Sequence, residues 1–163
     1  MTATTTADKR LTAQELAAWR GMLRVQAALL RQMDAELAAA HGLPLRSYEV
    51  LLRLEDAAGH RRRMTELCRD VVLSASGVSR LVDRLEKDGY VRRERCAYDG
   101  RGFFAVLTPS GERRLQEARA THLAGVRRLF LERLQAADLV QLAQYWEILV
   151  PGSTAPTADS RPE

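Results

Sequence analysis

Residues 73–91 of this chain read LSASGVSRLVDRLEKDGYV, and this stretch decides the fold. Ser74 stands directly before the helical part, where its side-chain oxygen can accept a hydrogen bond from a free amide of the first turn. Apolar residues then follow at helical spacing, at Val78, Leu81 and Leu85. Gly89 stands where a left-handed residue commonly ends a helix. The stretch therefore predicts an amphipathic helix over about residues 75–88.

A shorter helix is expected just upstream of this one. Thr65 can cap a helix over residues 66–71, and a three-residue turn then leads to the next helix. Two short helices joined by such a turn form a helix-turn-helix unit. Before this unit, a helix is expected over residues 45–58, followed by a short basic run at residues 60–63.

Downstream, the spacing of the apolar residues changes from helical to alternating. Residues 90–96 and 103–107 are rich in Val, Tyr and Phe and predict two strands. The residues between them, 97–102, include Asp and Gly, which favour a turn. We therefore expect a β-hairpin with a charged tip directly behind the helix-turn-helix.

A long helix is predicted before this lobe, over residues 11–40. Leucines recur every seven residues, at Leu16, Leu23, Leu30 and Leu37. At 1.5 Å per residue the helix would be roughly 45 Å long, too long for one small core to cover. Either it lies along its own domain, or part of the leucine seam faces a second subunit, and we prefer the second interpretation.

Two further helices are predicted after the hairpin. Thr108 followed by Pro109 favours a helix start, and this helix is expected over residues 109–134. A last helix is expected over residues 136–149. Its apolar residues share one stripe, at Leu139, Leu142, Trp146 and Leu149. The predicted fold is therefore mainly α with a small β-hairpin, a helix-turn-helix lobe between long helices.

The length and composition fit a single globular domain. The chain has 163 residues, of which 46% are hydrophobic and 28% are charged, enough apolar content for a real core. The expected parts are a disordered arm over residues 1–10, long helices over residues 11–42 and 109–150, a lobe over residues 43–108, and a disordered tail over residues 151–163.

Several classes of protein are disfavoured by the sequence. It contains no run of 18 apolar residues that predicts a transmembrane helix, and its Thr-rich and Ala-rich start is unlike a secretory signal. Cys68 and Cys96 are too few for a disulfide framework. A cytoplasmic location and no membrane partner are therefore the default expectation.

The excess of positive charge is concentrated in one part of the chain. Lys and Arg total 25 and Asp and Glu total 21, a formal net charge of +4. Residues 60–103 contain eleven basic and seven acidic residues, and the remainder of the chain contains fourteen of each. The whole excess therefore lies on the predicted helix-turn-helix and hairpin, which favours double-stranded DNA as the partner.

The residues expected to contact DNA lie on the second helix of this unit and on the hairpin. A helix fits the major groove, where Arg can donate two hydrogen bonds to guanine and Ser can serve a base edge or a phosphate. The candidates on the helix are Ser74, Ser76, Ser79, Arg80 and Arg84. The candidates on the hairpin are Arg93, Arg95, Asp99 and Arg101. For any single arginine, an ordinary solvated surface position is an equal alternative.

The chain also resembles the MarR (multiple antibiotic resistance regulator) family of winged-helix regulators. The resemblance is carried by residues 73–91, which run into Arg92-Arg93, then by Asp99-Gly100-Arg101 and by LTPSG at residues 107–111. It implies that Arg101 enters the minor groove and that Asp99 holds it in place by pairing with an arginine. Family members often have a second Arg where this chain has Gly100, which implies fewer contacts or a more flexible tip.

The same resemblance implies a triangular homodimer that binds a pseudo-palindromic operator. The N-terminal and C-terminal helices would form its interface, with Leu16, Trp19, Leu23, Leu139, Leu142 and Trp146 as candidates. Family members are commonly repressors released by a small aromatic or anionic ligand. Candidate pocket residues are Trp19, Leu23, Tyr48 and Leu52, although ordinary core packing is the preferred interpretation for them.

Three alternatives remain open. One branch of the family senses peroxide through a cysteine in the first long helix, and this chain has no cysteine there. Arginines near Cys96 could favour its thiolate form, but ordinary packing is the preferred interpretation for Cys96. The histidines, His41, His60 and His122, are scattered, so no catalytic, metal or cofactor site is predicted and an enzyme is not expected. A winged helix can also serve as a protein-interaction module, which sequence-selective DNA binding would exclude.

Overall fold

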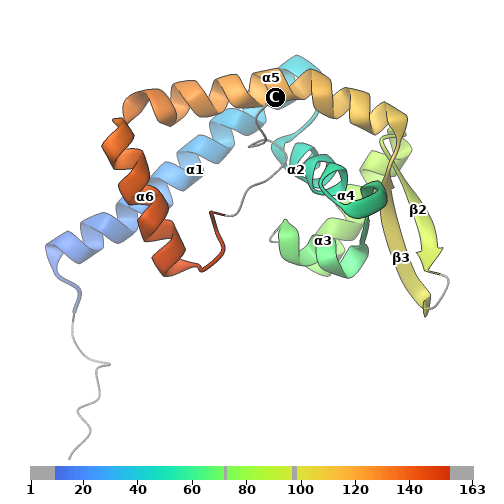
Figure 1. Cartoon of the computed structure of the whole chain (residues 1–163), viewed down its shortest axis with the longest axis horizontal. Coiled ribbons are helices and arrows are strands. Elements are labelled where there is room, and N and C mark those ends of the chain that lie inside the picture. The colour runs from blue at the N-terminus through green and yellow to red at the C-terminus, as the bar shows by residue number, and fades with distance from the viewer. Residues whose placement is uncertain (1–9, 72, 97–98, 155–163) are drawn as a thin grey trace, which may run out of the picture.

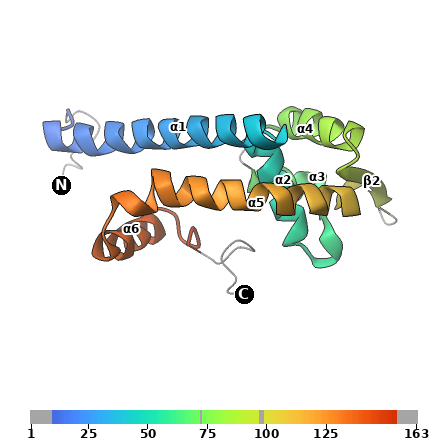
Figure 2. The ribbon, with the colours of Figure 1, turned by 90° about the horizontal axis from the view of Figure 1, so that it is seen from above.

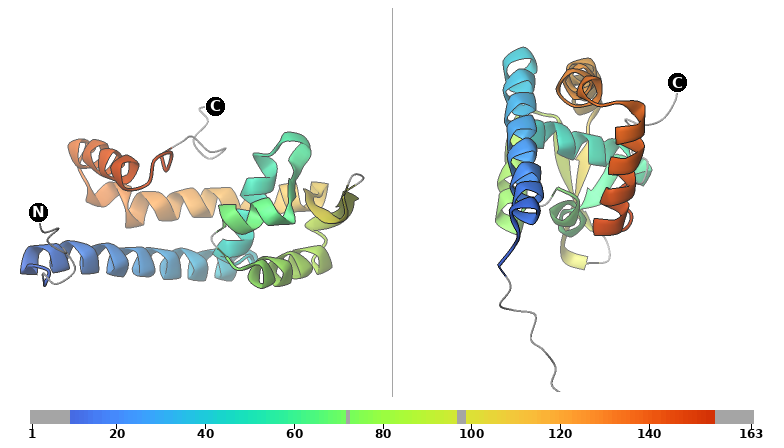
Figure 3. Two further views of the ribbon diagram at one scale, coloured as in Figure 1. Left: turned by 90° about the horizontal axis from the view of Figure 1, so that it is seen from below. Right: turned by 90° about the vertical axis from the view of Figure 1, so that its left-hand side faces the viewer.

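The computed structural model describes residues 10–71, 73–96 and 99–154. Two long helices, α1 (Ala13–His41) and α5 (Pro109–Leu129), run side by side, and a smaller lobe lies at one end of them (Figures 1 and 2). Helix α6 (Ala136–Leu149) lies at the other end, remote from the sheet (Figure 3). Within the ranges given, none of the helices is long and apolar enough to cross a membrane.

The lobe combines three short helices with a three-stranded antiparallel sheet. The helices are α2 (Leu45–Glu55), α3 (Met64–Asp70) and α4 (Ala75–Lys87), and the strands are β1 (Arg61–Arg63), β2 (Val91–Cys96) and β3 (Asp99–Leu107). The strand order is β1-β3-β2, so β3 is the central strand. The lobe is therefore a helix-turn-helix with a β-sheet wing, which confirms the predicted fold class.

One hydrophobic core joins the lobe to the long helices. Val78, Leu81 and Leu85 of α4 pack into it together with Tyr48 of α2, which is fully buried. Leu37 near the end of α1 and Leu115 of α5 enter the same core. The lobe therefore cannot move freely against the C-terminal part of α1 and the N-terminal part of α5.

The caps expected at the helix ends are present. Ser74 Oγ accepts a hydrogen bond from the amide of Gly77 at 3.2 Å, and Thr108 Oγ1 accepts one from Gly111 at 3.0 Å. Gly42, with φ +61°, ends α1, and Gly89, with φ +77°, follows α4. These residues fix the direction in which the chain enters and leaves α4 and the lobe.

The start of α5 is attached to the turn between α4 and β2. The Thr108 amide donates to the Tyr90 carbonyl oxygen at 3.1 Å, and Thr108 Oγ1 donates to the Gly89 carbonyl oxygen at 2.7 Å. A Cβ atom on Gly111 would lie only 2.1 Å from the Tyr90 carbonyl oxygen. Only glycine fits here. The close contact between Gly111 and Tyr90 couples the orientation of the wing to that of α5.

Three helix predictions need correction. The helix predicted over residues 45–58 ends at Glu55 and is followed by a 3-10 turn over Ala58–His60. Helix α3 begins at Met64 rather than after Thr65, because the backbone amide of Arg63 donates to Glu66 Oε2 at 3.1 Å and Arg63 occupies the capping position. The helix predicted over residues 109–134 ends at Leu129, and a 3-10 turn over Leu131–Arg133 leads into α6. No Gly or Pro marks this break, so local sequence could not reveal it.

The sheet also differs from the predicted hairpin. Strand β1 lies in the basic run, and its three arginines pair with β3 between Phe104 and Val106. Three consecutive arginines show no alternation, so only the tertiary pairing reveals this strand. Strand β3 begins at Asp99 rather than at residue 103, because Asp99 pairs with Cys96. Residues 99–102 of the predicted turn therefore belong to β3, and residues 97–98 lie outside the described residues.

The expected disordered ends lie mostly outside the part of the chain that the structure describes, which omits residues 1–9 and 155–163. The first four residues of the expected tail, 151–154, form a turn instead. The Glu147 carboxylate accepts hydrogen bonds from the Gly152 amide at 2.7 Å and from Thr154 Oγ1 at 2.8 Å. These contacts attach the turn to the end of α6.

Candidate nucleic-acid interface

The outward face of α4 carries three of the five predicted helix candidates. Ser76, Arg80 and Arg84 are spaced four residues apart and are all exposed, whereas the opposite face of α4 is buried. Ser74 differs, because its hydroxyl accepts the Gly77 amide and lies 3.2 Å from Ser76 Oγ. Ser79 is half-buried and lies on the side of α4 that faces the wing.

Arg80 and Arg84 are available for an external partner. Within the residues whose side chains are described, neither guanidinium takes part in an ion pair or hydrogen bond. Both line a surface hollow together with Leu73 and Gly77. Exposed cations beside a shallow groove are suited to a polyanionic partner such as DNA.

Arg46 at the start of α2 lines the same hollow and was missed by the sequence reasoning. Its guanidinium donates to Glu49 Oε2 at 2.8 Å and to the Val71 carbonyl oxygen at 3.4 Å, and its side chain is 43% exposed. Arg46 lies outside the basic window of residues 60–103, so the charge count could not include it. Only the packing of α2 beside α4 brings it to this surface.

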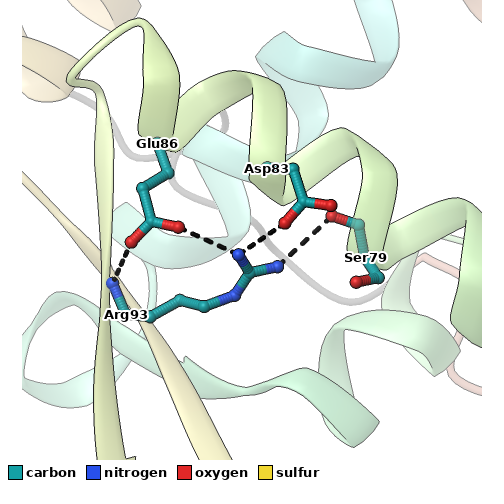
Figure 4. A network of polar contacts seen from close by, with 4 residues as sticks. All are labelled: Ser79, Asp83, Glu86 and Arg93. Carbon is teal, nitrogen blue, oxygen red and sulfur yellow. Dashed lines mark hydrogen bonds and ion pairs between the residues drawn. The ribbon is translucent and has the colours of Figure 1, made fainter.

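The wing candidates have different surroundings. Arg93, on β2, has its guanidinium bonded to three groups of α4 (Figure 4). Arg95 is exposed, and its guanidinium carbon lies 6.0 Å from the centre of the Phe103 ring. The backbone of Asp99 and Arg101 forms the start of β3, but their side chains lie outside the described part of the structure.

The outer face of the sheet carries a second group of charged residues. Register places Arg61, Arg92 and Glu94 on the face opposite α4. Glu94 forms ion pairs with both arginines, and the Arg61 guanidinium carbon lies 5.0 Å from the centre of the Phe104 ring. Two of the eleven basic residues counted in the sequence are therefore paired with Glu94 on the face away from α4.

Cys96 and Cys68 are free thiols in different environments. Cys96 is buried at the end of β2, and Arg63 donates a hydrogen bond to its Sγ at 3.4 Å. Cys68 is half-buried and lines a hollow between α3, α4 and the wing. Cys96 therefore packs beneath an arginine of β1, in agreement with the preferred packing interpretation.

The four residues predicted to line an effector pocket do not come together in one chain. Tyr48 is fully buried in the core, where its ring stacks on His122 with centres 4.5 Å apart, and Leu52 is 8% exposed. Trp19 and Leu23 are 54% and 42% exposed on the N-terminal half of α1. Within one chain this prediction needs correction, because Trp19 lies 11 residues before Leu30, where α1 begins to pack on the core, which is roughly 16 Å along the helix.

The two halves of the α1 seam differ in what covers them. Leu30, Met33 and Leu37 pack against the chain's own core. The N-terminal half, with Trp19 and Leu23, remains uncovered, apart from the half-buried Leu16 and Met22.

Helix α6 continues this uncovered apolar surface. None of its residues is buried: Leu139 and Leu142 are half-buried, and Trp146 is 37% exposed. Trp19 and Trp146 line one hollow between α1 and α6. Contiguous apolar surface of this kind is typical of an interaction site.

The fold and the exposed basic helix define a winged helix-turn-helix protein with long flanking helices. A family model described as MarR family matches residues 41–102. AbsC, a MarR family transcriptional regulator from Streptomyces coelicolor, is 35% identical, with a TM-score of 0.80 over 86% of this chain and 95% of that chain. Given this identity and coverage, the chain belongs to the MarR family.

Two further relatives are informative. The MarR family regulator Sco3205 from Streptomyces coelicolor, solved in complex with DNA, is 35% identical, with a TM-score of 0.81 over 86% of this chain and 91% of that chain. The HTH-type transcriptional repressor YetL from Bacillus subtilis (strain 168) is 31% identical over 88 residues. This second match spans 54% of the present chain and 53% of YetL, about half of each protein.

Proposed function

We propose that this protein is a transcriptional regulator that binds double-stranded DNA in a sequence-specific manner. The single observation that carries the proposal is the exposed face of α4, on which Ser76, Arg80 and Arg84 lie in a row. Helix α4 would enter the major groove, and its N-terminal half would reach base edges. The complex of Sco3205 with DNA supports the same role for this chain.

The flanking contacts would come from the wing and from α2. Arg95 would approach the neighbouring backbone, and Arg101 would enter the minor groove, where negative potential favours an arginine. Asp99 would hold an arginine in place. Arg46 would bind a phosphate beside the groove that α4 occupies.

The protein would act as a homodimer. The N-terminal half of α1 and helix α6 leave Trp19, Leu23 and Trp146 exposed, and an identical partner is the simplest cover for such a surface. A two-fold axis through this interface would present two α4 helices to a pseudo-palindromic operator. Their half-sites would be about one helical turn of DNA, roughly 34–36 Å, apart.

The sign of regulation is proposed to be repression, with release by a small aromatic or anionic effector. The repressor YetL supports the first part. A ligand would act by favouring a dimer whose two lobes no longer match the spacing of the half-sites. The regulator would have no enzymatic activity and would work in the cytoplasm, where the DNA is.

The test is selection of bound duplexes from a random library, followed by a footprint on DNA flanking the protein's own gene. We expect enrichment of a pseudo-palindrome and protection of two adjacent turns. Repetition with a panel of small aromatic acids tests for the effector, which should release the footprint. Equal affinity for selected and random duplexes would refute the proposal in favour of a protein-interaction module.

A further inference from the structure

Arg93, on strand β2 of the wing, connects the wing to helix α4 through several hydrogen bonds (Figure 4). Its Nη1 donates to Asp83 Oδ1 at 2.5 Å and to Glu86 Oε2 at 2.9 Å, and its Nη2 donates to the Ser79 carbonyl oxygen at 3.3 Å. Its backbone amide donates to Glu86 Oε1 at 3.1 Å. One residue of β2 therefore bonds to three residues of α4, which are spaced three or four positions apart along the helix.

The side chain of Arg93 has little capacity left for an external partner. It is 22% exposed, the smallest fraction in this cluster, whereas Asp83 and Glu86 are 56% and 40% exposed. A guanidinium has five N–H donors in a fixed fork, and here the fork faces α4. This environment contrasts with Arg80, whose guanidinium has no described partner.

The two acidic partners create an electrostatic difficulty that Arg93 relieves. Asp83 and Glu86 lie on the exposed side of a helix that is proposed to lie against phosphates, where unpaired carboxylates would repel DNA. Arg93 reduces the cluster from two negative charges to one. It does so from the strand that leads into the wing.

We propose that Arg93 is a positioning residue for DNA recognition and makes no contact with DNA itself. It holds the wing at a fixed angle to α4 and neutralises the carboxylates of Asp83 and Glu86, so that both elements engage DNA as one rigid unit. The inference rests on the proposed DNA-binding function. It replaces the expectation from sequence that Arg93 is a wing contact.

The first test measures the wing without DNA. Amide hydrogen exchange is compared among wild type, Arg93→Ala, Arg93→Lys and the control Arg92→Ala. Arg92 is the neighbouring residue on the opposite face of β2, bonded to Glu94 and not to α4. We expect faster exchange in β2 for both Arg93 variants and little change for the control. Exchange that stays as slow in Arg93→Ala as in wild type would overturn the proposed attachment of the wing to α4 by Arg93 (the clamp), whatever the DNA data show.

The second test measures DNA affinity against salt concentration, with a selected duplex and a random duplex as probes. Arg93→Ala should weaken binding to the selected duplex by about tenfold, because two charged hydrogen-bond acceptors lose their partner. Arg93→Lys should lose nearly as much, since an ammonium group cannot reproduce the fork.

A third variant separates positioning from direct contact. In Asp83→Asn/Glu86→Gln/Arg93→Ala, the carboxylates no longer need neutralising, so the part of the affinity lost through their repulsion of DNA should return, while the part that depends on the attached wing should stay lost. A direct phosphate contact predicts instead that the logarithmic salt slope falls by about 0.9 and that Arg93→Lys binds normally. Either result would overturn the proposal. Absence of any preference in the wild type would refute the DNA-binding function, while the exchange result would still decide the clamp.

Discussion

At the scale of single residues, the arginines of this lobe differ in what they already bind. Arg93 is bonded to α4, and Arg92 is paired with Glu94, whereas Arg80 and Arg84 have no described partner. Sequence alone gives all of these residues the same charge and neighbouring positions. Their separation into internal and external roles depends on which face of a strand or helix each occupies, and this follows from tertiary packing.

Arg80 is the residue most suited to read a base. We expect Arg80→Ala to relax base preference at one operator position, at a cost of about 1–3 kcal/mol if the guanidinium is bidentate to guanine. Competition binding against operators substituted at single positions measures this. The control is Lys87→Ala at the C-terminal end of α4, which should lower affinity evenly for all sequences. A uniform loss for Arg80→Ala as well would make Arg80 a phosphate contact.

Gly111 is expected to be intolerant of any side chain. Its substitution by Ala would place a Cβ atom 2.1 Å from the Tyr90 carbonyl oxygen, so α5 would have to shift away from β2. We expect Gly111→Ala to lower the free energy of unfolding by about 1–3 kcal/mol, as measured by urea denaturation. The neighbouring Ser110→Ala should change it little. An unchanged midpoint for Gly111→Ala would show that α5 can yield without cost.

At the scale of elements, three helix caps followed from the sequence, whereas the end of α5 and the first strand did not. The caps at Ser74, Thr108 and Gly89 depend on short-range hydrogen bonds and on a positive φ, so local sequence predicts them well. The end of α5 at Leu129 and the strand at Arg61–Arg63 depend on contacts with distant segments. No local pattern specifies either feature, and both were missed.

The pairing of α1 with α5 offers a pH test. The pKa of Glu36 is lowered, first by the hydrogen bond from Gln32 and then by the bond from Arg128. A carboxyl group with a lowered folded pKa stabilises the fold above its unfolded pKa of about 4.3, and this contribution disappears as pH falls through the folded value.

Glu36→Gln should therefore reduce the stability difference between pH 7 and pH 3. Urea denaturation at a series of pH values measures it, with Glu117→Gln as the control. Glu117 is an exposed carboxylate on α5 whose ion pair with Arg114 lies within that one helix. Equal pH profiles for wild type and Glu36→Gln would mean that the carboxylate contributes nothing through its bonds with Gln32 of α1 and Arg128 of α5.

At the scale of the whole molecule, the chain is divided into a covered half and an uncovered half. The lobe and the adjoining ends of α1 and α5 share one buried core that includes Leu37 and Leu115. The far half of α1 and all of α6 have no buried residue. The sequence placed the apolar seam correctly, but it could not show where the chain's own core ends along α1, because the leucine repeat is the same on both sides of that point.

Leu23 tests whether a second copy covers this surface. Leu23→Glu places a charge in the middle of the uncovered half of the seam, so burial against a partner would carry a large desolvation cost. We expect this variant to sediment as a monomer and to lose binding to a two-half-site operator, while its lobe stays folded by circular dichroism. The control is Ala28→Glu, an exposed position on the other side of α1, which should remain dimeric. A dimer that survives Leu23→Glu would place the interface elsewhere and would leave the exposed Trp19 and Trp146 as a surface for a different partner.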